Sequence, residues 1–99
     1  MKKHWIYLLA SKKNGTLYIG VTSNLTPRIY EHKQDLIPGF TKIYKVNQLV
    51  YVEQSSTMMQ AITREKQLKH WNRDWKIKLI EEKNPAWYDL SYQILEGML

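Results

Sequence analysis

Two short apolar segments near the N-terminus are separated by a polar turn, and this pattern predicts a β-hairpin. Residues 4–10 (HWIYLLA) are aromatic and branched, and residues 16–21 (TLYIGV) form the second segment. The polar residues between them end in Asn14-Gly15, a dipeptide that favours a tight turn. Gly20 lies near the end of the second segment, where a glycine indicates a bend or a close approach of the backbone to another group.

A helix is predicted directly after the hairpin, over about residues 25–33, with Ser23 or Asn24 as its N-cap. Pro27 falls in the first turn, where a missing backbone N–H costs little because those donors have no helical partner. A spacing of four residues predicts one stripe facing the sheet and a neighbouring polar stripe, with Leu25 and Ile29 on the first and Arg28 and His32 on the second.

The rest of the chain predicts one more strand and two more helices. Residues 35–46 are typical of a loop broken at Pro38-Gly39, and residues 48–54 (QLVYVEQ) predict the third strand. A capping-box pattern of Thr57 and Gln60 opens the second helix, and a third helix over 74–83 stops before Asn84-Pro85. The order β-β-α-β-α-α predicts an α/β sandwich of the α+β type, a small three-stranded antiparallel sheet flanked by helices. A length of 99 residues suits a single domain over residues 1–99.

The charge of the chain favours an anionic partner. Fifteen Lys and Arg against nine Asp and Glu give a net charge of +6. Residues 1–80 hold fourteen basic and five acidic groups (+9), whereas residues 81–99 hold one basic and four acidic groups (−3). A basic body of this kind is typical of proteins that bind nucleic acid, although many small basic proteins are merely soluble.

The absence of cysteine limits the kinds of cross-link and metal site that the chain can form. It excludes disulfides and thiolate metal sites, and it suits a cytoplasmic protein. Any metal must be held by oxygen or imidazole, and the three histidines show no zinc spacing. No apolar stretch approaches the ~20 residues of a membrane span, so no membrane association is expected.

Glu65 is the most informative candidate because it lies on the apolar stripe of the second predicted helix. It is four residues from Ala61 and three from both Ile62 and Leu68. An inward carboxylate is costly unless it is paired. The structural alternative is a buried salt bridge with Lys or Arg, or an edge position that reaches water. The functional alternative is a carboxylate that lines a cleft and holds Mg²⁺. Periodicity alone favours the structural alternative, since charged residues are common at helix edges.

Tyr7 and Tyr18 lie on adjacent predicted strands and can approach each other on one face. Buried tyrosines usually serve as core aromatics with a satisfied hydroxyl. The functional alternative makes one phenol a base or proton relay, which requires nearby cations because the ordinary pKa of tyrosine is about 10. Arg28 and His32 form either a plain surface pair or a phosphate contact with a group for proton transfer.

These residues stand in an ordered set that resembles the GIY-YIG nuclease superfamily. The first motif is Trp5-Ile6-Tyr7 and the second is Tyr18-Ile19-Gly20, with ten residues between them. The similarity covers residues 5–90 and is greatest with small stand-alone members related to the catalytic domain of the bacterial excision-repair incision nuclease. It continues through further matched segments, namely residues 20–25, Arg28, residues 31–33, 49–51, 61–69 and 84–90.

The resemblance implies a metal-dependent endonuclease that hydrolyses DNA. Glu65 is then expected to coordinate one divalent cation, Mg²⁺ or Mn²⁺, and Arg28 to neutralise the scissile phosphate. Tyr7 or Tyr18 is expected to activate or orient the attacking water, while His32 assists proton transfer or holds the phosphate. DNA contacts are expected from a further group: Gly20, which keeps the strand end open to the phosphate backbone, together with Lys42, Arg64, Lys69 and Asn84.

Two departures from the family pattern shape the expected activity. Trp5 stands where the motif has its first glycine, a variable position in a strand, and activity is expected to survive this change. Many family nucleases carry a separate DNA-recognition domain, which this chain lacks. Cleavage is therefore expected to be structure-selective or weakly specific, or to depend on an unidentified protein partner that supplies specificity.

Two alternatives to an enzyme remain. The first is a non-catalytic nucleic-acid-binding module of the same fold, suggested by the basic residues of the second predicted helix. The second is a protein-interaction domain that uses the aromatic segment from Trp87 to Tyr92. An inward carboxylate beside two tyrosines favours the enzyme, because a binding module has no need of it.

Overall fold

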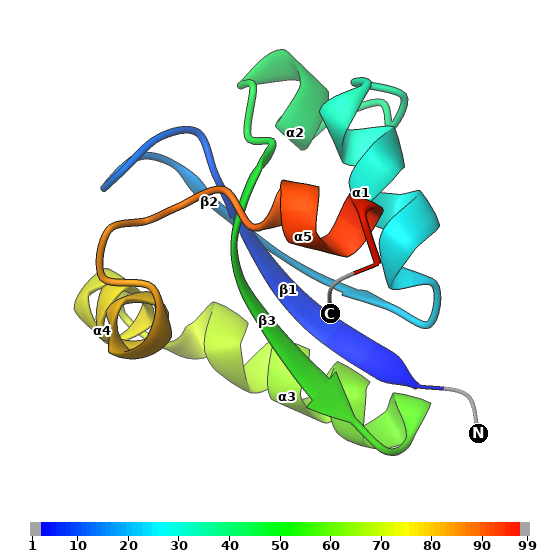
Figure 1. Cartoon of the computed structure of the whole chain (residues 1–99). Coiled ribbons are helices and arrows are strands. Elements are labelled where there is room, and N and C mark those ends of the chain that lie inside the picture. Colours follow the sequence, from blue (N-terminus) through cyan, green and yellow to red (C-terminus); the bar gives the residue numbers. More distant parts are fainter. Residues whose placement is uncertain (1–2, 98–99) are drawn as a thin grey trace.

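The computed structural model describes residues 3–97, which form three strands and five helices arranged as a sheet between two helical layers (Figure 1). Helix α3 lies on one side of the sheet, and α1 and α5 lie on the other. The elements are β1 (His4–Ala10), β2 (Leu17–Thr22), α1 (Leu25–Lys33), α2 (Phe40–Ile43), β3 (Gln48–Ser55), α3 (Met58–His70), α4 (Arg73–Lys83) and α5 (Ser91–Leu95). This confirms the predicted three-stranded α+β fold.

The sheet is antiparallel with strand order β2-β1-β3, so β1 is central and β2 and β3 are the two edges. In the β1–β2 register, Tyr7 lies opposite Gly20 and Leu9 lies opposite Tyr18. Because side chains alternate along a strand, these four residues share one face of the sheet. The predicted approach of Tyr7 and Tyr18 on one face is therefore confirmed.

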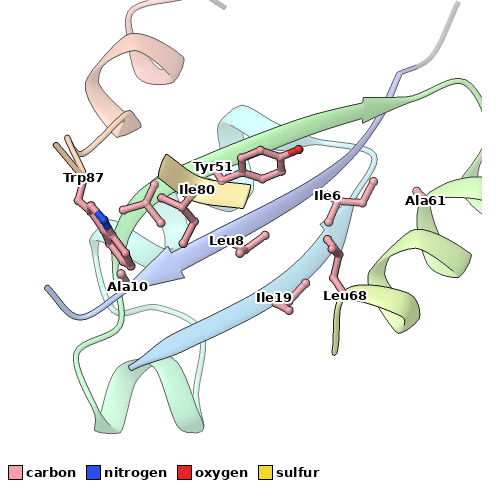
Figure 2. Packing of buried hydrophobic residues seen from close by; sticks show 10 residues of the cluster. Ile6, Leu8, Ala10, Ile19, Tyr51, Ala61, Leu68, Ile80 and Trp87 are labelled. Carbon is pink, nitrogen blue, oxygen red and sulfur yellow. The ribbon is translucent and has the colours of Figure 1, made fainter. Parts of the chain in front are cut away.

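Each face of the sheet has its own hydrophobic core. On one face, Ile6, Leu8 and Ala10 of β1 belong to one cluster with Ala61 and Leu68 of α3. Figure 2 shows Ile6 near Ala61 and Leu68, and Ala10 at the other end of the strand beside Trp87. Tyr7 and Leu9 pack on the other face in a second cluster, together with Leu25, Ile29, Val46, Leu49 and Ile94. The sheet thus separates the layer that carries Glu65, on α3, from the layer that carries Arg28 and His32, on α1.

Helix α3 begins as its capping pattern predicts, with one difference. The Oγ1 atom of Thr57 accepts a hydrogen bond from the backbone N–H of Gln60 at 3.1 Å. The side chain of Gln60 does not complete the reciprocal bond of a capping box, because its Oε1 accepts instead from the hydroxyl of Ser56 at 2.7 Å. Asn24 is the N-cap residue of α1, and its own N–H donates to Thr22 Oγ1 at 3.0 Å.

The segment predicted as a loop over 35–46 contains the single-turn helix α2, so that part of the prediction is wrong. Gly39 precedes the helix with a φ of 108°, a conformation that glycine adopts readily and that turns the chain into Phe40. Four residues of helix are too few for a periodic signal in the sequence, which is why α2 was not predicted.

The segment after α4 folds back over the sheet and ends in α5, which packs on α1. Asp89 ties it down: its carboxylate accepts hydrogen bonds from Lys33 on α1, from the backbone N–H of Leu49 at 3.0 Å and from Ser91. The backbone N–H of Leu90 also donates to the carbonyl of Leu49 at 2.7 Å. This segment therefore links α1 to β3.

Candidate active site

Two tyrosines and one histidine meet on the α1 face of the sheet. The hydroxyl of Tyr7 and Nε2 of His32 are hydrogen-bonded at 3.0 Å. The ring centroid of Tyr18 lies 6.3 Å from that of Tyr7 and 5.9 Å from that of His32. Tyr7 and His32 are only 2% and 3% exposed, whereas Tyr18 is partly exposed. Strands β1 and β2 and helix α1 thus bring together three of the predicted catalytic side chains.

Gly20 makes this cluster possible in a different way from the one predicted. A Cβ atom at Gly20 would lie 2.3 Å from Cζ and 2.4 Å from the hydroxyl oxygen of Tyr7. The ring of Tyr7 therefore occupies the space that a side chain would need, and only glycine permits it. The expectation that Gly20 keeps the strand end open to the phosphate backbone is wrong, because Gly20 is buried under Tyr7.

Burial sets the charge state of the Tyr7–His32 pair. It raises the pKa of the Tyr7 hydroxyl above its usual value, as does the neighbouring Tyr18, and Arg28 offsets only part of this. Burial also lowers the pKa of His32 to about 4, with a further contribution from the positive charge of Arg28. Near neutral pH both side chains are therefore uncharged.

His32 keeps one unsatisfied polar atom inside the cluster. Within residues 3–97, its Nδ1 is buried and has no hydrogen-bond partner. Whichever tautomer the neutral ring adopts, one buried ring position is left without a protein partner. Buried polar groups are nearly always paired, and exceptions gather at functional sites.

Arg28 lies one turn before His32 on α1 and is about 42% exposed. Its Nε is 3.8 Å from Oε1 of Glu31, a loose contact between two solvent-exposed groups that contributes little to stability. Arg28 lines a surface hollow of about 310 Å³ together with Glu31, Thr22, Asn24 and Pro27. Its effect on the pKa values of Tyr7 and His32 shows that its charge reaches the buried cluster.

Glu65 projects from α3, which covers the opposite face of the sheet from Tyr7. Its side chain is only 14% exposed, and its carboxylate forms an ion pair with Lys69 Nζ at 3.3 Å. Burial is the main cause of the raised pKa of Tyr7, and the negative charge of Glu65 makes only the smallest contribution to it. The carboxylate of Glu65 is largely buried, as its place on the apolar stripe predicts. The ion pair is not the buried salt bridge considered from the sequence, because the side chain of Lys69 is 52% exposed.

A hollow at the β2 edge connects the two faces. It has a volume of about 320 Å³ and is lined by Leu17, Tyr18, Ile19, Phe40, Lys69 and Lys76. Tyr18 comes from the face of the tyrosine cluster and Lys69 from the helix of Glu65. Lys42, another predicted DNA contact, is exposed on α2, the helix that supplies Phe40.

Lys76 was missed in the sequence because it belongs to another helix than Lys69. Its Nζ donates to the carbonyl of Lys69 at 3.4 Å, across the break between α3 and α4. Lys69 and Lys76 are seven residues apart, a spacing that places two side chains on the same face of one continuous helix. The sequence predicts two separate helices here, so this spacing did not indicate a shared surface.

Arg64 does not share the surface of Lys69. Its guanidinium donates two hydrogen bonds to the carboxylate of Glu53 on β3, at 2.8 and 3.1 Å. Since β2 and β3 are opposite edges of the sheet, Arg64 and Lys69 lie on different flanks of α3. The basic residues of this helix are therefore divided between two flanks, and Arg64 is paired with Glu53.

Asn84 has a structural role in place of the expected DNA contact. It is 5% exposed, and its amide nitrogen donates to the carbonyls of Val50 at 3.1 Å and Tyr88 at 2.9 Å. Its Oδ1 accepts from the backbone N–H of Tyr88 at 2.9 Å. All the hydrogens of this amide are used, so it holds the chain after α4 against β3.

The available ligands fit a divalent cation of the magnesium type. Among residues 3–97, no three or more His, Asp or Glu side chains gather to enclose a metal ion. A hard cation such as Mg²⁺ needs only one or two protein carboxylates when water and phosphate oxygens complete its shell. Glu65, largely buried and close enough to affect Tyr7, is suited to be that one ligand.

Comparison with known proteins agrees with this geometry. A model of the GIY-YIG catalytic domain matches residues 3–78. A UPF0213 protein of Staphylococcus saprophyticus is 39% identical over 82 residues, which cover 83% of this chain and 99% of that protein. A UPF0213 protein of Staphylococcus haemolyticus is 37% identical over 83 residues, covering 84% of this chain and all of that protein.

A solved structure also shares the fold. The solution NMR structure of a UPF0213 protein from Bacillus halodurans aligns with a TM-score of 0.55 and 25% sequence identity. The alignment covers 88% of this chain and 92% of that one.

Within residues 3–97, none of the helices combines the length and apolar character that crossing a membrane requires. The chain belongs to the GIY-YIG nuclease superfamily, among its UPF0213 members.

Proposed function

We propose that this protein is a metal-dependent endonuclease that hydrolyses DNA phosphodiester bonds with structure selectivity or weak sequence specificity. The observation that carries the proposal is the meeting of Tyr7, Tyr18 and His32 in one cluster on which the charges of Arg28 and Glu65 act. A hydrolase acting on phosphate needs a group that handles a proton, a cation beside the phosphate and a site for a metal ion. These five residues supply all three.

Differences in burial divide the work between the two tyrosines. Tyr18 is partly exposed and lines the hollow at the β2 edge, so it can touch an attacking water molecule. Tyr7 is buried, its hydroxyl is bonded to His32, and its raised pKa keeps it protonated near neutral pH. We therefore assign the contact with water to Tyr18, while Tyr7 holds His32 in place.

Arg28 and Glu65 would neutralise the negative charge of the phosphate, Arg28 directly and Glu65 through a bound cation. Arg28 is exposed enough to meet a phosphate, and a guanidinium matches the geometry of phosphate oxygens. Glu65 would hold Mg²⁺ or Mn²⁺, and a bound cation supplies charge neutralisation at phosphate oxygens and at the leaving oxygen. Nucleases of this superfamily generally depend on divalent metal ions, which is consistent with this assignment.

The test is nicking of supercoiled plasmid and of a branched oligonucleotide, with Mg²⁺, Mn²⁺ or EDTA. We expect metal-dependent nicking by the wild type and a loss of at least about 100-fold in Glu65→Ala, comparable to removing one group that stabilises charge in a transition state. The exposed carboxylate of Glu96 offers a matched control, and Glu96→Gln should nick like the wild type.

Three outcomes would contradict the proposal. Cleavage that persists in EDTA would show that no metal ion is required, and cleavage by Glu65→Ala at the wild-type rate would remove Glu65 from the reaction. If neither protein cuts and both bind DNA alike, the protein is a nucleic-acid-binding module of the same fold. Lys69 and Lys76 at the β2 edge would then contribute to its affinity.

A further inference from the structure

Two tryptophans at the junction of α3 and α4 form a surface that the proposed hydrolysis does not use. Trp71 is the C-cap residue of α3, and Trp75 lies in the first turn of α4. Their ring centroids are 5.8 Å apart and their planes are nearly perpendicular, at 87°. Trp75 is 54% exposed, although side chains of this size are buried for the most part.

Each side of Trp71 borders a hollow. The first, of about 310 Å³, is lined by both tryptophans and by Lys78, Leu79 and Glu82. The second, of about 480 Å³, is lined by Trp71, Thr63, Lys66, Gln67 and His70. The guanidinium of Arg64 lies 5.2 Å from the ring centroid of Trp71. Two lysines, Lys66 and Lys78, thus border the indoles, together with one carboxylate, Glu82.

Two lysines that line the hollow of Tyr18 lie on the same helices, α3 and α4, as the residues around the tryptophans. Lys69 is three residues beyond Lys66 on α3 and lines the hollow that contains Tyr18. Lys76 follows Trp75 in the chain and lines that same hollow.

We propose that Trp71 and Trp75 form a docking surface for an unpaired segment of DNA. Bases stack on the exposed indole faces, and phosphates lie against Lys66 and Lys78. Exposed aromatic rings between lysines are what a single strand requires, because it presents both base faces and a charged backbone. In a duplex the bases are already stacked on one another, so they cannot use the indoles. The identity of the ligand as DNA rests on the proposed function, but the docking itself requires no hydrolysis.

The experiment measures binding without turnover, by fluorescence anisotropy in EDTA. The probes are a labelled thymidine oligonucleotide of about 20 nucleotides and an abasic oligonucleotide of the same length, which carries the same charge without bases. We expect the wild type to bind the thymidine probe more tightly. Trp75→Ala should weaken that binding roughly 5- to 150-fold, the range for losing one stacked base, and leave the abasic probe unaffected.

Matched variants separate stacking from folding. Trp75 is the first choice because Trp71 packs against the core beside α3. Trp75→Phe keeps a ring and should retain most of the binding. Tyr88→Ala removes an aromatic side chain of 73% exposure that lines neither hollow, and should bind like the wild type. A uridine oligonucleotide distinguishes RNA from DNA, and tighter binding of it than of the thymidine probe would overturn the assignment to DNA.

Equal affinities of the wild type for the thymidine and abasic probes would overturn the inference, as would unchanged binding by Trp75→Ala. Either result together with metal-dependent nicking overturns the docking surface alone. A Trp75 effect without any nicking leaves the docking surface in place and overturns the proposed hydrolysis alone.

Discussion

At the scale of single residues, His32 makes the stability of the protein depend on pH. Its pKa is lowered from 6.5 to about 4 by burial and by Arg28, so the unfolded chain binds a proton that the folded chain rejects between these values. Stability is therefore complete above about pH 6.5 and is lost progressively as the pH falls towards 4.

We expect the free energy of unfolding to fall by up to about 1.4 kcal/mol per pH unit in that window. Urea unfolding at pH 7.0 and 5.0 measures this fall in the wild type. His32→Asn has no imidazole at this position and should lose most of the pH dependence, whatever its absolute stability. Parallel curves for the two proteins would show that another group is responsible.

The sequence placed Tyr7, Tyr18 and Glu65 correctly because alternation along strands and the helical period fix the face on which a residue lies. It could not show the role of Gly20. Glycine at a strand end is compatible both with an approaching ligand and with a neighbouring ring. Only the position of the Tyr7 ring, which depends on α1 packing behind it, distinguishes them.

At the scale of elements, Asp89 holds α1, β3 and α5 in one arrangement. The side chain of Lys33 and two residues of the chain around β3 and α5 all donate to its carboxylate. Desolvation opposes the charged form, but the hydrogen bonds from Lys33 and Ser91 outweigh it and leave the pKa of Asp89 below its usual value. An ionised carboxylate is thus built into this junction.

Asp89→Asn should lower the free energy of unfolding by about 1–3 kcal/mol, since it leaves buried donors with a weaker acceptor. Urea unfolding of the wild type, Asp89→Asn, Lys33→Met and the double variant tests this in a double-mutant cycle. Because α1 carries Arg28 and His32, nicking should fall with Asp89→Asn as well. Additive losses in the cycle would refute the coupling of Lys33 to Asp89.

The long elements were predictable and the shortest one was not. Helices α3 and α4 repeat their apolar pattern over three turns or more, and Thr57 marks the start of α3. Helix α2 spans four residues, too short for a period to be recognised. The apolar segment 86–95 predicts a partly helical tail that docks on the body, and α5 forms there. The capping box was only half formed because Ser56 competes for the side chain of Gln60.

At the scale of the whole molecule, the positive charge is divided into cations that are free to meet DNA and cations already paired within the fold. Lys76, at the β2 edge beside Tyr18, belongs to the first kind. Among the described residues it has no carboxylate partner, and it donates only one long hydrogen bond, to the carbonyl of Lys69. Arg64 belongs to the second, because Glu53 accepts both of its hydrogen bonds at the β3 edge. Both residues add one positive charge to the net charge of the chain. The sequence therefore could not show which of them is paired with a carboxylate in the fold.

The salt dependence of DNA binding should separate these two cations. Each phosphate contact that is lost reduces the slope of log K against log salt by about one. Lys76→Gln should therefore lower the slope by about one, while Arg64→Gln should leave the slope unchanged and lower stability instead. The measurement is binding of duplex DNA across a salt series, and an equal effect of both variants would refute the division.

The placement of the site across the β2 edge has a consequence during synthesis of the chain. Tyr7, Tyr18, Arg28 and His32 all emerge from the ribosome before residue 33, but Glu65 follows on α3 after β3 has been made. A nascent chain that ends before α3 therefore carries the aromatic and cationic half of the site without its carboxylate. On the proposed mechanism such a chain cannot cut the nucleic acid that surrounds it, and hydrolysis begins only when α3 docks against the finished sheet.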